Sequence, residues 1–234
     1  MSERFHLPSP PAGDAAVLTG DEARHLARVL RARPGDEVVV FAGTGVEWPA
    51  RVVAVGRDEV TLALGPPRPD PPRVGPRLTL AVALPKGERQ KWLVEKLTEL
   101  GVARLVPLVT TRGVAEATDA ARGRLERGVI EACKQCGRNR PMEIGPPRSL
   151  VAALADMAAE DRAVVADPGG GPLEAGRLAA GQAGVLAAVG PEGGFTAEEL
   201  AAADRAGAIR ASLGPHILRV ETAAIALAAR LGSV

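Results

Sequence analysis

The sequence predicts an α/β protein in which a small β-barrel module precedes a parallel sheet covered by helices on both faces. Three observations support this fold class. β-branched runs separated by glycine-containing turns occur between residues 37 and 64, as in short strands of a small barrel. A proline-rich stretch follows at 65–76. Apolar runs then alternate with helical patterns to the end, which is typical of parallel sheets.

These boundaries predict a small domain at 1–66, a proline-rich linker at 67–76 and a larger domain at 77–234. In the small domain, Thr19-Gly-Asp-Glu22 has the pattern of a capping box and predicts a helix through about Arg31. The linker prolines cannot continue a helix or occupy a central strand, so they form a semi-rigid spacer. Strands of the small domain are expected at 37–41, 50–55 and 60–64.

The larger domain is predicted to alternate strands with helices. Leu93, Leu97 and Leu100 recur at helical spacing before Gly101, and Thr196 with Glu199 forms a second capping-box pattern. A glycine-rich turn is expected after the strand at 163–166. The strands are expected at 78–84, 105–109, 163–166, 184–189 and 208–213, and the helices at 86–100, 119–137, 149–157, 197–206 and 218–231.

The composition predicts a cytoplasmic protein. Hydrophobic residues make up 46% of the 234 residues, but no apolar run approaches the ~20 residues of a membrane span. The first residues lack the pattern of a signal peptide. Cys133 and Cys136 are the only cysteines, too few for a disulfide framework.

The net charge of +1 conceals a segregation of charge along the chain. Residues 78–140 carry twelve basic and seven acidic side chains, whereas 141–234 carry seven basic and eleven acidic ones. A basic segment in a neutral protein indicates a polyanion-binding surface, although an ordinary solvated helix face would give the same count. Lys86, Arg89 and Lys91 crowd a helix start, where positive charge is unfavourable, and this indicates an anionic partner.

Several common sites are excluded by the motifs. The chain contains neither a P-loop pattern nor a Gly-x-Gly-x-x-Gly dinucleotide motif. Its three histidines are isolated, and Cys133-Lys-Gln-Cys136 lies in a predicted helix without a second pair. We therefore expect no metal and interpret the two thiols as packed side chains.

Two glycine-rich segments, 190–195 and 213–215, each follow an apolar strand and precede a helix. Glycine at such turns lets the backbone approach a ligand, and ligands of open parallel sheets bind at the carboxyl ends of the strands. Together they predict one pocket built largely from main-chain groups. Glu192 would either brace its turn or face the ligand. Arg219 would either act in the pocket or form a structural salt bridge with Glu221 or Glu192.

At this point the motifs resemble a known family. Gly190-Pro-Glu-Gly-Gly-Phe195, Leu213-Gly-Pro-x-Ile-Leu-Arg-x-Glu-Thr-Ala223 and Lys96-Leu-Thr-Glu-Leu-Gly-Val102 are similar to segments of the bacterial 16S ribosomal RNA uracil-N3 methyltransferases of the SPOUT class. Arg4, His25, Val29-Leu30-Arg31 and Gly35-Asp36 resemble the PUA-like RNA-binding domain of that family. The sequence departs from the family pattern at His216, where arginine is expected, and at Lys134, where glutamate is expected.

The resemblance implies a trefoil-knot methyltransferase domain, S-adenosylmethionine as the methyl donor, a homodimer, and 16S ribosomal RNA or the small ribosomal subunit as the substrate. It also implies roles for individual residues. Arg219 would stabilise negative charge on the uracil, and Glu221 would be a candidate proton acceptor. Cofactor contacts are implied for Ala166, Asp167, Gly190, Pro191, Glu192, Gly193, Leu213, Gly214, Ile217 and Leu218, and RNA contacts for Arg4, His25, Arg28, Arg31, Lys86, Arg89 and Arg138.

Two other functions remain open from the sequence. The enzyme could methylate a different RNA atom, such as a ribose 2′-hydroxyl. Alternatively, the chain could be a non-catalytic RNA-binding protein that retains the cofactor fold without its activity.

Overall fold

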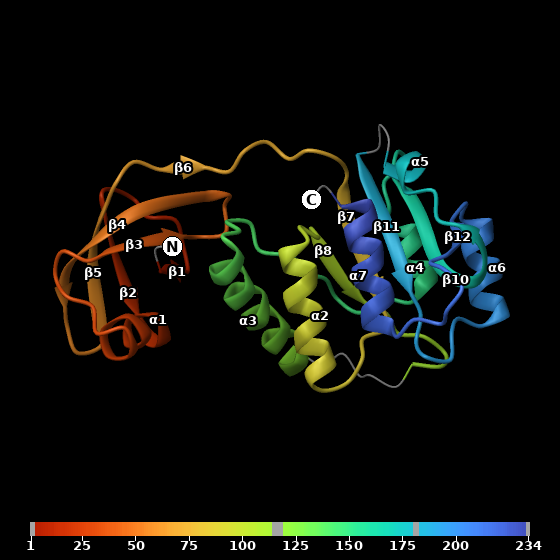
Figure 1. Cartoon of the computed structure of the whole chain (residues 1–234), viewed down its shortest axis with the longest axis horizontal. Coiled ribbons are helices and arrows are strands. Elements are labelled where there is room, and N and C mark those ends of the chain that lie inside the picture. The colour runs from red at the N-terminus through yellow and green to blue at the C-terminus, as the bar shows by residue number, and fades with distance from the viewer. Residues whose placement is uncertain (1–2, 114–118, 180–182, 233–234) are drawn as a thin grey trace. The chain divides into compact units, whose positions relative to one another are not determined.

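The computed structural model describes residues 3–113, 119–179 and 183–232, and it divides into two compact units (Figure 1). The first unit comprises residues 1–72 and the returning segment Ile130–Pro141. The second comprises Arg73–Val129 and Met142–Val234. The functional domain boundaries at residues 66 and 76 stay a prediction.

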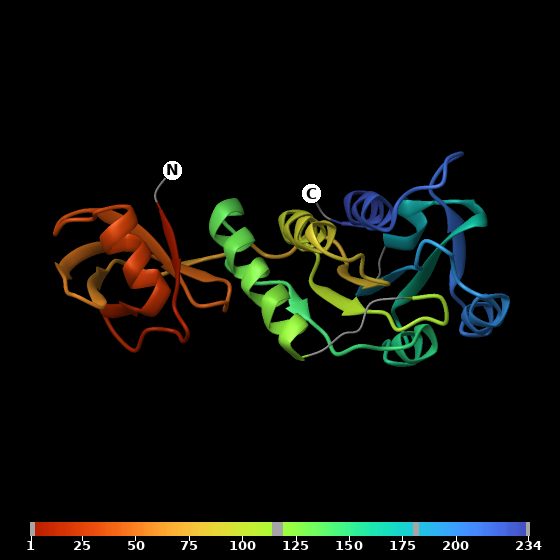
Figure 2. The same cartoon turned by 90° about the horizontal axis from the view of Figure 1, so that it is seen from below.

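The first unit is a curled six-stranded sheet, which Figure 2 shows with a short helix beside it. The strands are paired in the order β1-β3-β4-β5-β2, with β6 paired to β4, and only β1 and β3 are parallel. Phe5, Leu26 and Leu62 are fully covered in its core. The strands are β1 Arg4–His6, β2 Ala15–Thr19, β3 Glu37–Phe41, β4 Val46–Val55, β5 Glu59–Leu64 and β6 Arg68–Pro69.

The helix of this unit differs from its prediction. α1 spans Gly20–Arg24 and continues as one π-helical turn, His25–Val29, so Arg31 lies beyond it at a φ of 55°. The capping box predicted at Thr19 is wrong, because the Thr19 side chain makes no capping hydrogen bond. The Glu22 carboxylate instead accepts a hydrogen bond of 3.0 Å from Lys134 Nζ, so a tertiary contact takes the carboxylate that the local motif would have used.

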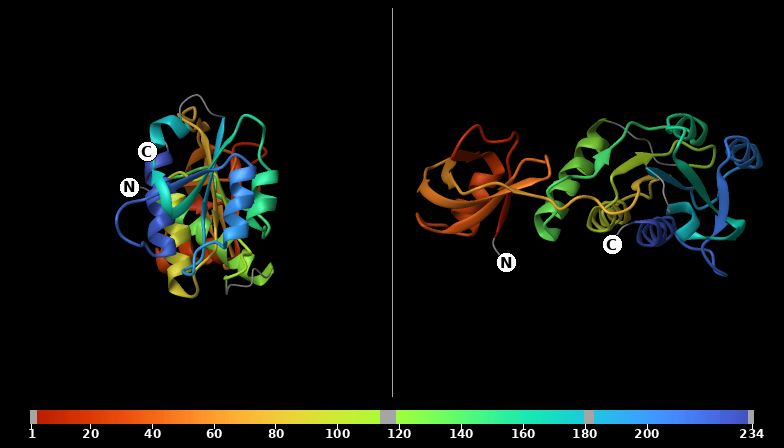
Figure 3. Two further views of the ribbon diagram at one scale, coloured as in Figure 1. Left: turned by 90° about the vertical axis from the view of Figure 1, so that its right-hand side faces the viewer. Right: turned by 90° about the horizontal axis from the view of Figure 1, so that it is seen from above.

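The second unit is a fully parallel six-stranded sheet with the order β12-β10-β11-β7-β8-β9. α2 and α7 cover one face, and α4 and α6 cover the other (Figure 3, left). The strands are β7 Arg77–Val82, β8 Arg104–Pro107, β9 Glu143–Ile144, β10 Arg162–Pro172, β11 Gly184–Val189 and β12 Ile209–Ser212. The helices are α2 Glu88–Glu99, α3 Asp119–Cys136, α4 Leu150–Ala155, α5 Ala175–Ala179, α6 Ala197–Arg205 and α7 Val220–Leu231. The last residues of α3, from Ile130 on, belong to the first unit.

Side-chain alternation explains how one sheet supports two helical layers. Leu186 and Ala188 of β11 belong to the apolar cluster that contains α4 and α6. Val185, Ala187 and Val189 are also buried and point to the opposite face, because successive strand residues alternate. β11 is therefore apolar along its whole length and central. α7 packs on this opposite face against α2, β7 and β11, which is why the helix is apolar nearly all round.

β10 corrects the prediction of a glycine-rich turn after residue 166. The strand continues to Pro172, and Gly171 and Pro172 pair with β12 after an irregularity that begins at Ala166. At Gly170 a Cβ atom would lie 2.6 Å from the backbone of Arg210. The glycines therefore serve a bulged strand that passes close to its neighbour.

The architecture predicted from the sequence is confirmed: a parallel-sheet α/β domain follows a small β unit. The capping box at Thr196 and Glu199 is also confirmed, with both of its hydrogen bonds present. Among the described residues, no helix has the length and apolar character needed to span a bilayer.

Candidate active site

A cavity of about 580 Å³ lies at the carboxyl ends of β11 and β12 and beside the irregularity of β10, at the edge where an open parallel sheet binds its ligands. We call it the cofactor cavity. The ten residues that the sequence implied for cofactor contact all line it: Ala166, Asp167, Gly190, Pro191, Glu192, Gly193, Leu213, Gly214, Ile217 and Leu218. Its lining also includes residues that the sequence analysis did not assign, namely Pro168, Ser212, Pro215 and His216.

The first glycine-rich turn owes its shape to close packing. A Cβ atom at Gly190 would lie 3.0 Å from the ring of Phe195, which is itself buried. Gly194 has a φ of 68°, which favours glycine. Thr196 then caps α6. The turn is therefore fixed at both ends, and its middle residues face the cavity.

The second turn is open toward the cavity. Gly214 has a φ of 143°, and a Cβ atom built there would meet no atom within 4 Å. The Ser212 hydroxyl donates to the Gly214 carbonyl oxygen over 3.1 Å. Leu213 and Leu218 are half-buried beside it. Open space next to main-chain groups and aliphatic side chains fits a nucleoside-bearing cofactor, whose flat base and polar edges need both.

Asp167 is held by the neighbouring strand. Its Oδ2 accepts a hydrogen bond of 2.7 Å from Arg210 Nε, and its Oδ1 accepts one of 3.1 Å from the Gly169 N–H. The hydrogen bond and charge of Asp167 raise the pKa of Arg210 above its ordinary value. Two acidic residues line the cofactor cavity. Asp167 accepts these two hydrogen bonds, whereas Glu192 is the more exposed of the two.

Arg219 and Glu221 do not form the salt bridge that the sequence left open. Arg219 is the exposed N-cap residue of α7, and within the described residues its side chain makes no hydrogen bond or ion pair. Glu221 pairs with Arg89 instead, with Nη1 and Oε2 3.7 Å apart. Arg89 Nη1 also lies 3.6 Å from Glu192 Oε1. Glu221 has only 6% of its side chain exposed and does not line the cofactor cavity.

Arg112 is a site residue that the sequence did not reveal. Its Nη1 donates to the Gly193 carbonyl oxygen over 2.6 Å, and a Cβ atom at Gly193 would lie 3.3 Å from its side chain. Arg112 lies in the loop that follows β8. That loop contains no recognisable sequence motif, so the sequence did not indicate that Arg112 belongs to the site. It braces the cavity turn from outside.

The residues implied for RNA contact divide between the two units. Lys86 and Arg89 belong to the second unit and are exposed. The other five belong to the first unit, where His25, Arg28 and Arg31 are exposed. Arg138 is half-buried, and its Nε donates to the Arg140 carbonyl oxygen over 2.5 Å. Their contact with RNA stays a prediction.

Arg4 lies inside the first unit rather than on its surface. Only 9% of its side chain is exposed, and its Nη1 contacts Glu47 Oε2 at 2.6 Å. Its second terminal nitrogen donates to the side chain of buried Asn139, which in turn donates to Asp70 over 2.7 Å. Burial raises the pKa of Glu47, but the hydrogen bonds of Arg4 and Asn139 and the charges of Arg4 and Arg68 together lower it below its ordinary value.

Replacing Arg4 with alanine is expected to lower the free energy of unfolding by about 2 kcal/mol, because a half-buried carboxylate loses its partner. In the natural protein this contribution of Glu47 is present above the carboxyl's ordinary pKa of 4.5 and is lost as the pH falls below it. Urea unfolding at pH 7 and pH 4 measures both effects.

Arg51→Ala is the matched control, since its ion pair with Glu37 lies in the same sheet but is exposed on both sides. It should change stability by less than about 1 kcal/mol. Equal losses in the two variants would contradict the structural role of Arg4.

Lys134, which departs from the family pattern, also belongs to the first unit. Its Nζ contacts Glu22 and Glu131, and it lies 5.9 Å from the centre of the Phe5 ring. Burial lowers its pKa, but the hydrogen bonds of the two carboxylates raise it overall. Within the described residues, no three histidine, cysteine or acidic side chains gather as metal ligands would. Cys133 is buried and Cys136 exposed.

The parallel sheet, the glycine-lined cavity at its carboxyl edge and the PUA-like unit define a SPOUT-type RNA-modifying protein. A family model for the RNA methyltransferase domain matches residues 73–232, and a model for the RNA methyltransferase PUA domain matches residues 18–64. The chain belongs to the RNA methyltransferase family, which confirms the resemblance seen in its motifs.

Relatives with assigned names are similar along nearly the whole chain. A Mycobacterium tuberculosis protein named ribosomal RNA small subunit methyltransferase E is 35% identical over 96% of this chain and 87% of its own length. The protein of that name from Bacillus subtilis is 29% identical over 88% of this chain and 85% of its own.

Solved structures of similar proteins have the same fold as this chain. The ribosomal RNA small subunit methyltransferase E of Neisseria gonorrhoeae, bound to S-adenosyl methionine, has a TM-score of 0.89 at 30% identity, covering 98% of this chain and 96% of its own. A putative methyltransferase of Legionella pneumophila with bound SAM has a TM-score of 0.88 at 29% identity, covering 99% and 97%.

Proposed function

We propose that this enzyme transfers a methyl group from S-adenosylmethionine to N3 of one uridine of 16S ribosomal RNA, acting as a cytoplasmic homodimer on that RNA or on the small ribosomal subunit. The observation that carries the proposal is the cofactor cavity, whose lining contains every residue implied for cofactor contact. The bound S-adenosyl methionine of the Neisseria neighbour and the names of the relatives support the donor and the class of substrate.

S-adenosylmethionine supplies a methyl group already activated on a positively charged sulfur. The protein must therefore orient the uracil and remove one proton. Uracil N3 becomes a nucleophile when it loses its hydrogen. The new bond joins N3 to the methyl carbon, while the carbon–sulfur bond breaks with its electron pair going to sulfur. Because N3 lies on the base-pairing edge, the uridine must be unpaired or flipped out of its stack.

Arg219 is the residue that we propose to stabilise negative charge on the uracil oxygens. Its position at the N-cap of α7 is unfavourable for a cation, because the helix N-terminus is already positive. It has no acid partner among the described residues, whereas Glu192 and Glu221 both pair with Arg89. An unpaired cation between Leu218 and Val220, which both line the cofactor cavity, is available to the substrate.

The proton of N3 needs an acceptor, and we propose Glu192 for this role. Glu221, the candidate from the sequence, lies outside the cofactor cavity. Asp167 lines the cavity but is held by Arg210. Glu192 lines the cavity with an exposed carboxylate, and its 3.6 Å contact with Arg89 is longer than a hydrogen bond, so it can approach the reacting nitrogen. Glu221 then contributes through Arg89 rather than by touching the substrate.

The function is tested by incubating the purified full chain with tritiated S-adenosylmethionine and either naked 16S RNA or assembled small subunits. We expect methyl transfer, with 3-methyluridine as the modified nucleoside by mass spectrometry. A methylated ribose would establish the alternative RNA atom. Cofactor binding without transfer to any RNA would establish a non-catalytic RNA-binding protein.

A further inference from the structure

A second, smaller cavity lies on the other side of the 190–192 turn. Its volume is about 160 Å³, well below the range of sites for drug-sized ligands. It is formed at the carboxyl ends of β7 and β8, and it shares Pro191 and Glu192 with the cofactor cavity. The two cavities are therefore neighbours across one turn. The second cavity is lined by Ala83, Leu84, Pro85, Lys86, Arg89, Leu108, Gly113, Pro191 and Glu192.

Arg89, the arginine that lines the second cavity, is held in place by a buried carboxylate. Glu221 lies in the first turn of α7, where the helix N-terminus favours a carboxylate. Its Oε2 is buried without a hydrogen-bond partner, and the nearest cation is Arg89, 3.7 Å away. A buried carboxylate is costly without a paired cation. Glu221 therefore holds the guanidinium of Arg89 at the cavity wall, although 44% of the Arg89 side chain remains exposed.

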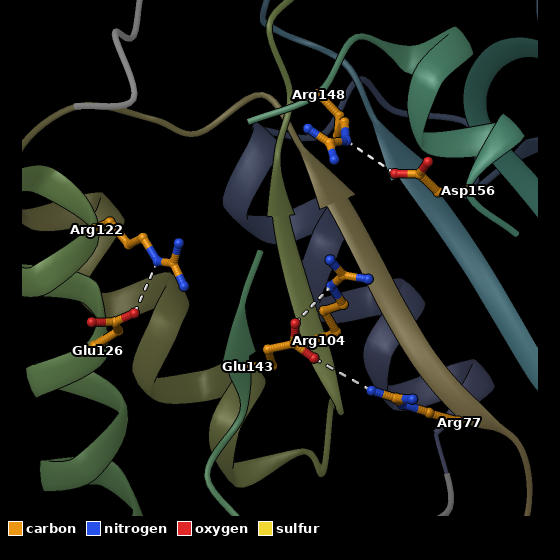
Figure 4. Close-up of polar contacts among 7 residues, drawn as sticks. All are labelled: Arg77, Arg104, Arg122, Glu126, Glu143, Arg148 and Asp156. Atoms are coloured by element: carbon orange, nitrogen blue, oxygen red, sulfur yellow. Dashed lines mark hydrogen bonds and ion pairs between the residues drawn. The ribbon is translucent and has the colours of Figure 1, made fainter. Parts of the chain in front are cut away.

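Arginines also line a cavity of about 360 Å³ on the face of the same sheet that α4 covers. There Arg77 and Arg104 both contact Glu143, and Arg148 contacts Asp156 (Figure 4). This third cavity shares no lining residue with the cofactor cavity. It cannot present a base to the methyl donor, but it supplies matched control residues.

We propose that the second cavity receives the acceptor pyrimidine of the RNA, and that Arg89 donates to a carbonyl oxygen beside the reacting nitrogen. Glu221 is a positioning residue that acts through Arg89. The cavity is small enough for a single ring, is cationic on one wall, and places its occupant against Glu192 and the cofactor cavity. This inference rests on the proposed function, because it names where that reaction holds its substrate.

The position of the base is tested by cross-linking with the full chain. The nucleotide that the natural protein methylates is mapped first and then replaced with 4-thiouridine in an RNA fragment. The cross-link is made with S-adenosylhomocysteine bound and is located by peptide mass spectrometry. We expect it within 83–89 or at 191–192. Cross-links confined to other segments would overturn the proposal.

The roles of Arg89 and Glu221 are tested by a double-mutant cycle. Arg89→Gln should slow methyl transfer by about 100-fold, the effect of losing one charge-stabilising donor, and leave S-adenosylhomocysteine affinity within about 2-fold. Glu221→Gln should slow transfer less. The double variant should be no slower than Arg89→Gln alone, and it also avoids an unpaired buried charge if the single variant folds poorly.

Arg77→Gln is the control, because it removes an arginine at the amino end of β7, and it should leave transfer unchanged. Normal transfer by Arg89→Gln, or fully additive losses in the double variant, would contradict these roles. The identity of the modified nucleoside made by the natural protein decides the proposed function separately. Methylation at another RNA atom would refute N3 as the target, while the cross-link would still report whether the base occupies this cavity.

Discussion

Replacing Arg219 with alanine is expected to slow methyl transfer by at least about 100-fold while leaving cofactor affinity unchanged. The side chain is exposed at the N-cap of α7 and is not among the residues that line the cofactor cavity. Its loss should therefore remove stabilisation of the charged uracil without disturbing the bound donor. Single-turnover transfer and calorimetry with S-adenosylhomocysteine measure the two quantities separately.

Two further variants sharpen this result. Arg219→Lys keeps the charge but loses the planar fork of donors, so its rate should lie between those of the natural protein and Arg219→Ala. Arg205→Ala removes an exposed arginine from the last turn of α6 and should transfer at the normal rate. A normal rate for Arg219→Ala in a folded protein would show that Arg219 has no catalytic role.

The fragment 75–234 is expected to bind the cofactor as the full chain does and to lose roughly 100-fold or more of its site-specific methylation. Every residue that lines the cofactor cavity lies in the second unit, and so do the apolar clusters beneath it. The exposed His25, Arg28 and Arg31 lie in the first unit. Phosphate contacts supply affinity, whereas shape and base contacts supply discrimination.

The same deletion leaves Ile130–Pro141 without its partners in the first unit. Asn139 loses Arg4 and Asp70, and Lys134 loses Glu22. We expect local fraying at the end of α3, visible as faster amide exchange there, with the sheet intact. Light scattering tests the proposed dimer of the fragment. Full activity on the native RNA would show that the first unit does not select the substrate.

Local patterns in the sequence predicted much of this fold. The continuous apolar run at 184–189 identified the central strand to the residue, because a strand buried on both faces must be apolar at every position. The capping box at Thr196 was read correctly, because its partners are three residues apart and depend little on the rest of the chain. The glycine turns located the cofactor cavity, since close backbone approach requires glycine wherever it occurs.

Short edge strands were not predicted, because their formation depends on distant residues rather than on a local pattern. β1 and β9 have three and two residues, too few for a period of two to appear, and their existence depends on pairing with distant strands. The glycines at 169–171 were interpreted as a turn, although Gly170 is needed because Arg210 of β12 passes against it. No residue within ten positions of Gly170 in the sequence indicates that contact.

The sequence by itself determined the parallel sheet, the small β unit and the place of the cavity at two glycine turns, because hydrophobic periodicity and glycine geometry act over a few residues. The PUA-like character and the individual cofactor contacts came from the resemblance to the methyltransferase family. Only the tertiary structure decided which charges pair. Arg89 rather than Arg219 contacts Glu192 and Glu221, and Arg4 is enclosed by Glu47 and Asn139. The strength of an ion pair depends on separation and burial, and for residues this far apart in the chain both are fixed only when the packed elements bring them together.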